Sequence, residues 1–178
     1  MSELVRLAGT GRAGDASVTW TVSEGRRGRR WREVLTRDGR IVHSLLLETD
    51  PDRRFAHLEL SVAGVLLTLH PEGDGTLHGN RVDEAGAGVE HVEGLPFPIG
   101  AFVVVDGSPL ATAAVVWGGQ GSGGGHPTSA ILGALVDRRG RVTVVETEEL
   151  LTRLTPGLTV DEHGIPRLDG AAIWPLER

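Results

Sequence analysis

The chain has 178 residues, of which 39% are hydrophobic, enough for one domain with a sizeable core. Its net charge of -6 and pI of about 5.6 argue against a general nucleic-acid binder. It contains no cysteine, which excludes disulfides and thiolate metal sites. We find neither a secretory signal nor an apolar run long enough to span a bilayer, so we expect a cytoplasmic protein with no integral membrane segment.

The first half of the chain is dominated by strand patterns. Residues 1–16 show no sustained period, and we expect them to be poorly ordered. Residues 17–23 alternate, with Val18, Trp20 and Val22 on one face, as in a half-buried strand. The Asp38-Gly39 dipeptide predicts a hairpin. Further short strands, separated by turn residues, are expected at 31–37, 40–49, 54–62, 65–70, 76–78 and 89–92, with a polar loop at 80–88.

Two hairpins in series are predicted in the second half. The first pairs residues 99–105 with 111–117 across an Asp-Gly-Ser-Pro turn, and the second pairs 131–136 with 141–145. A glycine-rich, flexible loop at 118–128 separates them. Residues 147–154 form the one expected helix, with Thr147 as its N-cap. Beyond it, a short hairpin is expected about 161–164, before residues 173–175.

Ten or eleven short strands against one helix predict a mainly β fold. No alternation of strands with long helices supports a βαβ arrangement. A sheet of so many strands has to curl, close or fold over. We therefore expect a single domain over 1–178, built on one strongly curved antiparallel sheet, a β-roll or half-barrel, with the helix plugging or flanking one end.

No complete catalytic or metal-binding motif appears. Residues 119–124 match GxGxxG but lack the helix that a dinucleotide site needs after it, so a surface loop is favoured and we expect no cofactor. Histidines near carboxylates fit no metal signature, and we expect no metal there: His70, His78 and His91, near Glu72, Asp74, Glu90 and Glu93. His43 and His57 lie on strands that face either a cavity or the core. Five clustered arginines favour a solvated hairpin tip, with contact to the head group of a ligand as the alternative: Arg26, Arg27, Arg29, Arg30 and Arg32.

Several strands are apolar on both faces, which a sheet covered on one side does not need. Residues 45–47, 65–67 and 103–105 are the examples. Either the roll buries both faces, or one face lines a cavity for an apolar ligand. The predicted ligand-contacting side chains are Trp31, Leu45, Leu47, Leu67, Phe97, Phe102, Val104 and Trp117.

The order of elements from about residue 31 to 154 resembles a bacterial family of glycolipid-binding proteins. The resemblance is carried by residues 89–93, 95–99, a strand ending at Trp117, 130–137, 140–142 and 149–153. Asp137, Gly140 and Arg153 match best, whereas Gly100 and Ala101 replace the family's paired arginines. The resemblance implies an open β-roll, like that of lipoprotein carriers, which binds an amphipathic lipid or glycolipid.

We therefore favour non-catalytic binding of an amphipathic small molecule in an apolar concavity. Two alternatives stay open. One is a hydrolase or isomerase that uses a His/carboxylate pair in the same cavity. The other is a protein-interaction module that uses an exposed sheet edge. The oligomeric state does not follow from the sequence.

Overall fold

The computed structural model describes residues 5–86, 88–120, 132–146, 159–161, 163–167 and 173–175. The strands of the first half are β1 (Arg6–Ala13), β2 (Ala16–Gly25), β3 (Gly28–Arg37), β4 (Arg40–Thr49), β5 (Phe55–Val62), β6 (Val65–Pro71), β7 (Thr76–Asp83) and β8 (Val89–Pro96). The second half contains β9 (Val103–Val105), α1 (Pro109–Gln120), β10 (Leu132–Val136), β11 (Val142–Glu146), β12 (Thr159–Val160), β13 (Pro166–Arg167) and β14 (Ile173–Pro175).

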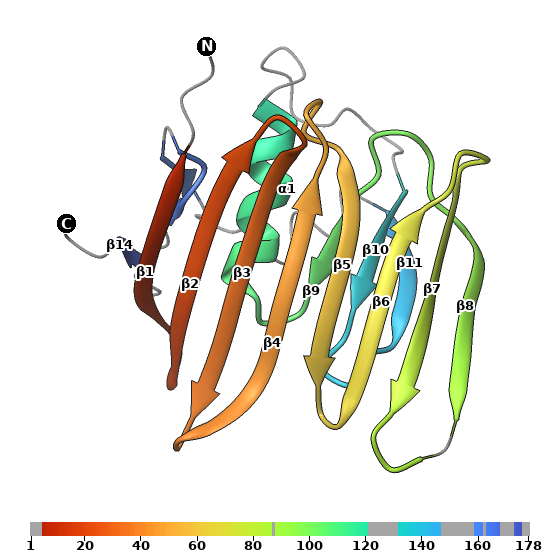
Figure 1. Cartoon of the computed structure of the whole chain (residues 1–178), viewed down its shortest axis with the longest axis horizontal. Coiled ribbons are helices and arrows are strands. Elements are labelled where there is room, and N and C mark those ends of the chain that lie inside the picture. The colour runs from red at the N-terminus through yellow and green to blue at the C-terminus, as the bar shows by residue number, and fades with distance from the viewer. Residues whose placement is uncertain are drawn as a thin grey trace.

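Nine strands form one large sheet in the order β14-β1-β2-β3-β4-β5-β6-β7-β8 (Figure 1). Every neighbouring pair is antiparallel. Strands β14 and β8 are its two edges, so the sheet is open over the described residues. The predicted mainly β, antiparallel class is confirmed. The strong curvature expected of a β-roll is not confirmed.

The hairpin turns of the large sheet follow the predicted chemistry. Asp38 and Gly39 have φ values of 51° and 72°, and Ala63 and Gly64 have 50° and 75°. Positive φ at both central residues defines a type I′ turn, whose twist matches that of the flanking strands. The alternation also holds, because Val18, Trp20 and Val22 of β2 are buried while their neighbours are exposed.

Two segments without a strand pattern also join the large sheet. Residues 6–13, in the segment that we expected to be poorly ordered, form β1. The polar loop predicted at 80–88 is wrong in its first part, because β7 runs to Asp83. Strand pairing uses backbone groups, so a polar or glycine-rich segment joins a sheet when its neighbour offers a free edge.

The first of the two predicted central hairpins is wrong. Residues 109–120 form helix α1 and not a returning strand. Ser108 caps the helix, since its Oγ accepts a hydrogen bond from the Ala111 amide at 3.1 Å. Pro109 takes the first helical position, where its missing N–H costs nothing. We interpreted Ser-Pro as part of a turn, whereas it marks a helix start.

Helix α1 is the crossover of a βαβ unit, an arrangement that we did not expect. Strands β9 and β10 are parallel neighbours in a second sheet, ordered β11-β10-β9. The predicted hairpin of β10 with β11 is confirmed. All three residues of β9 are buried. Its apolar run therefore reflects a short strand that is covered on both faces, as in parallel sheets.

The core lies between the two layers. Helix α1 lies behind β3 and β4, and the second sheet lies behind β5 and β6 (Figure 1). The helix is apolar on most of its surface because it contacts the large sheet on one side and β9 on another. Helix α1 thus covers a face of the large sheet.

The C-terminal segment is described only in part. Strands β12 and β13 pair about the predicted turn, which confirms that hairpin. The helix predicted at 147–154 lies outside the described residues, as do residues 121–128 of the glycine-rich loop. The loop predicted at 118–120 is wrong, because these residues end α1. Within the described ranges, no helix has the length and apolar character needed to cross a membrane.

The turn between β10 and β11 is held by Asp137. Its Oδ1 accepts hydrogen bonds from the amides of Arg139 and Arg141, at 2.8 and 2.9 Å. Partial burial alone would raise the pKa of the Asp137 carboxyl, but these two amides, together with the positive charges of Arg141 and Arg139, outweigh it and keep that pKa below its ordinary value. A carboxyl whose folded pKa is lowered stabilises the fold above its unfolded pKa, and this stabilisation is lost as the pH falls through the folded pKa.

We expect Asp137→Ala to reduce the free energy of unfolding by about 1 kcal/mol at neutral pH, because two turn amides lose their acceptor. The difference from the wild type should shrink as the pH falls below the ordinary aspartate pKa of about 3.9 and through the lower folded pKa, where protonation leaves only a neutral acceptor such as Asn also offers. Urea titrations between neutral and acidic pH measure this. Asp137→Asn, which retains an acceptor oxygen without the charge, should keep most of the stability but lose the pH dependence. An equal loss for Asn and Ala would contradict the assignment.

Candidate functional site

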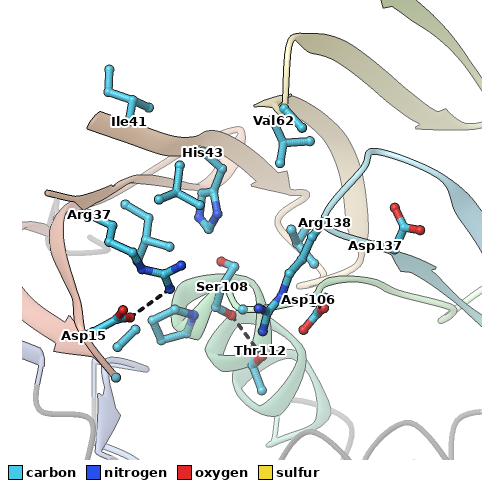
Figure 2. Close-up of a pocket in the computed structure, with 18 of the residues that line it drawn as sticks. Asp15, Arg37, Ile41, His43, Val62, Asp106, Ser108, Thr112, Asp137 and Arg138 are labelled. Carbon is cyan, nitrogen blue, oxygen red and sulfur yellow. Dashed lines mark hydrogen bonds and ion pairs between the residues drawn. The ribbon is translucent and has the colours of Figure 1, made fainter. Parts of the chain in front are cut away.

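A pocket of about 780 Å³ opens where the tip of the β3–β4 hairpin meets the start of α1. The β1–β2, β5–β6 and β10–β11 turns complete its walls. Figure 2 shows residues from these separate elements around one space. The site therefore depends on the βαβ unit, which carries α1 against the large sheet.

The wall formed by the large sheet is mostly apolar. Leu35 and Val62 are buried, whereas Ile41 is 67% exposed at the mouth of the pocket. An aliphatic side chain so exposed at a pocket mouth offers free apolar surface to a ligand.

Ion pairs line the rim. Arg37 contacts Asp15 at 2.8 Å, and Arg138 contacts Asp106 at 2.9 Å (Figure 2). Asp137 adds a third carboxylate. Cationic and anionic groups are therefore both present, and the two arginines and three carboxylates give the rim a net charge of -1.

His43, which lines the pocket, belongs to a buried His/carboxylate pair. His43 Nε2 lies 2.6 Å from Glu33 Oε1, and both side chains are almost fully buried. The other Glu33 oxygen accepts a hydrogen bond from the Leu110 amide in the first turn of α1, at 3.0 Å. Both carboxylate oxygens are thus held, one by β4 and one by the helix. An amide at a helix N-terminus is a favourable partner for a carboxylate.

Ser108 lies next to this pair at the start of the helix. It also lines the pocket, and Figure 2 shows it facing the ring of His43. Its Oγ accepts from Ala111, and its carbonyl accepts from the Thr112 hydroxyl at 3.0 Å. The serine is therefore held by the helix that it caps.

Of these groups, only His43 lies on a strand that the sequence analysis places facing either a cavity or the core. Glu33 was missed, although it interrupts an inward-facing series in β3 in which Trp31 and Leu35 are its buried neighbours. A carboxylate on an apolar strand face is a usable signal, because a buried charge requires a partner. The partners of Glu33 are His43 in β4 and the Leu110 amide in α1, and the sequence does not reveal that these elements meet β3 here.

The eight predicted ligand-contacting residues lie elsewhere. None of them lines this pocket or a second, smaller one beside β8. Six belong to the main core: Trp31, Leu45, Leu47, Leu67, Phe97 and Trp117. Val104 and the half-buried Phe102 belong to a smaller cluster between α1 and the second sheet. Their contact with a ligand stays a prediction, and their observed role is to pack the layers together.

The five clustered arginines differ in their exposure to solvent. Arg26, Arg27, Arg30 and Arg32 are exposed, as predicted for a solvated hairpin tip. Arg29 differs, because it is only 4% exposed and points inward from β3. The interpretation of Arg29 as a solvated side chain is therefore wrong.

Arg29 joins three parts of the fold. Its guanidinium lies 3.8 Å from the ring centroid of Trp117, donates to Glu24, and donates to the backbone carbonyl of His163 beside β12. Burial lowers the pKa of Arg29, and the hydrogen bonds and charge of Glu24 oppose that shift. Arg53 contacts the same tryptophan ring, at 4.2 Å. These contacts tie the end of α1 to the large sheet and to the β12–β13 hairpin.

The remaining histidines have ordinary polar partners. His57 lies 3.2 Å from Glu59, and His70 lies 3.1 Å from Glu72. His91 lies 2.8 Å from Asn80. Across the part of the chain that the structure describes, no three His, Asp or Glu side chains gather as metal ligands.

The chain was compared with family models, curated proteins and solved structures. No match was found in any of the three. The resemblance to the glycolipid-binding family is neither supported nor refuted by these comparisons and stays a prediction.

Proposed function

We propose that the pocket between the β3–β4 hairpin and α1 binds a small amphipathic molecule with a hydroxyl-rich head group. The observation that carries this proposal is an aliphatic wall opposite a rim of paired guanidinium and carboxylate groups. The volume of about 780 Å³ falls within the range of pockets for drug-sized ligands. It suits a head group with a short apolar part.

The balance of charges on the rim favours hydroxyl groups over an anionic head. Arg37 and Arg138 already have carboxylate partners, so an anion would have to compete with Asp15 and Asp106. A hydroxyl both donates and accepts, so it pairs with guanidinium and carboxylate groups without breaking either ion pair. Sugar head groups carry several such hydroxyls. The family resemblance favours the same class of ligand, and the β-roll that it implies stays part of this proposal.

Octyl β-D-glucoside, below its micellar concentration, is a suitable probe. We expect it to shift backbone amide NMR signals of residues lining the pocket, and to bind more tightly than glucose or octanoate. Ile41→Asp should weaken binding about tenfold, because the mouth loses apolar surface equivalent to one or two buried methylene groups.

Leu66→Asp is the matched control, since Leu66 is 45% exposed on the large sheet and does not line the pocket. It should leave octyl glucoside binding unchanged. Shifts confined to residues away from the pocket, or an equal effect of both substitutions, would refute the proposal. Native mass spectrometry of freshly purified protein, followed by lipid extraction, then identifies any ligand that co-purifies.

A further inference from the structure

We propose that His43 is a general base that hydrolyses a short-chain carboxylic ester bound in this pocket, with Glu33 as its positioning residue. The inference rests on the proposed function, because the ester would be the amphipathic ligand. It adds a reaction to the binding site.

Stability alone does not account for the Glu33–His43 pair. The exposed fraction is 1% for Glu33 and 3% for His43. Burying such groups costs free energy, and apolar side chains of similar size serve a core equally well or better. The surrounding positions on the same sheet face, including Trp31, Leu35 and Leu45, are apolar. A carboxylate that orients a histidine at the edge of a pocket is typical of acid–base sites.

The hydrogen bonds determine which ring nitrogen is the base. A carboxylate only accepts, so the bond to Glu33 Oε1 places the proton of neutral His43 on Nε2. Nδ1 then carries a lone pair, and it has no partner among the described residues. Because His43 lines the pocket and faces Ser108, this lone pair is available to a molecule bound there (Figure 2).

Water is the nucleophile in this reaction. Ser108 Oγ caps α1, and the first helical amides are already used by Glu33 and Ser108. His43 Nδ1 removes a proton from water as the water oxygen bonds to the ester carbonyl carbon, and the carbonyl electron pair moves to its oxygen. Arg37 and Arg138 line the pocket, and each guanidinium has N–H donors beyond those that its carboxylate partner accepts, so one of them donates to this oxyanion without breaking the ion pair. When the C–O bond to the alcohol breaks, the imidazolium returns its proton to the departing oxygen, leaving an acid, an alcohol and neutral His43.

The test is hydrolysis of p-nitrophenyl butyrate by the full chain. We expect a saturable rate well above that of free imidazole at equal concentration. His43→Gln should lower kcat about 100-fold or more, the contribution expected of a general base. Glu33→Gln should lower kcat about tenfold with KM unchanged, and free imidazole should partly restore the activity of His43→Ala. If the pair had only a structural role, Glu33→Gln would not lower kcat at an unchanged KM, and free imidazole would not restore activity to His43→Ala.

His57→Gln is the matched control, because His57 contacts Glu59 in an exposed pair away from the pocket. Its rate should equal that of the wild type. If His43→Gln does not fold, Ile41→Asp still tests the site, since Ile41 is 67% exposed and its substitution should raise KM. No saturable wild-type activity, a folded His43→Gln variant with full activity, or an unchanged KM for Ile41→Asp overturns the inference. Octyl glucoside binding without ester turnover overturns the inference alone, whereas failure of both overturns the proposed function as well.

Discussion

Glu33→Ala should reduce the free energy of unfolding by about 3 kcal/mol, because it breaks a buried polar pair. The substitution leaves His43 Nε2 and the Leu110 amide without their acceptor inside the protein. It also removes a link between β3 and the start of α1. Urea denaturation, followed by tryptophan fluorescence, measures the change.

Two further variants test this explanation. Glu59→Ala, in the exposed His57–Glu59 pair, should change stability by less than about 0.5 kcal/mol. The double variant Glu33→Leu/His43→Leu should recover much of the loss, because it replaces both polar partners with apolar ones. A Glu33→Ala cost no greater than that of Glu59→Ala would show that the buried carboxylate does not anchor the helix.

Arg29→Ala should cost about 2–3 kcal/mol, since the Trp117 ring loses one of its two guanidinium partners and the His163 carbonyl loses the Arg29 donor. Arg29→Lys should recover only part of this loss, because an ammonium group lacks the planar fork that bonds Glu24 through two nitrogens. Thermal and urea unfolding measure both variants.

Arg30→Ala is the control in the adjacent position. Arg30 pairs with Glu48, but its side chain is 51% exposed. An exposed ion pair contributes at most about 1 kcal/mol. If Arg29→Ala and Arg30→Ala destabilise equally, Arg29 does not join α1 to the β12–β13 hairpin in the way that the contacts indicate.

The hairpins of the large sheet were predictable because their signals are local. Alternating burial in β2 and the Asp38-Gly39 turn depend on residues within a few positions of one another. The β10–β11 hairpin follows for the same reason, as does the β12–β13 hairpin. The predicted family resemblance and cytoplasmic location depend on no such local signal, and they stay predictions.

Helix α1 was not predictable from periodicity, because it is apolar on most of its surface. A short apolar run is compatible with both a buried helix and a buried strand. The capping signal at Ser108 and Pro109 was present, but a Gly-Ser-Pro sequence also suits a turn. The parallel pairing of β9 with β10 then decided the outcome, since a parallel neighbour requires a crossover between the two strands.

The sequence by itself determined the antiparallel meander from β2 to β6 and, in β2, the face that each side chain occupies. Only the tertiary structure decided which polar residues meet. Glu33, His43 and the Leu110 amide are up to 77 residues apart, and their contacts exist because α1 lies across the large sheet. Arg29 is buried for the same reason, because Trp117 and the β12–β13 hairpin cover it. Strand and turn patterns report a residue's local conformation, whereas its partners depend on which distant element covers that face.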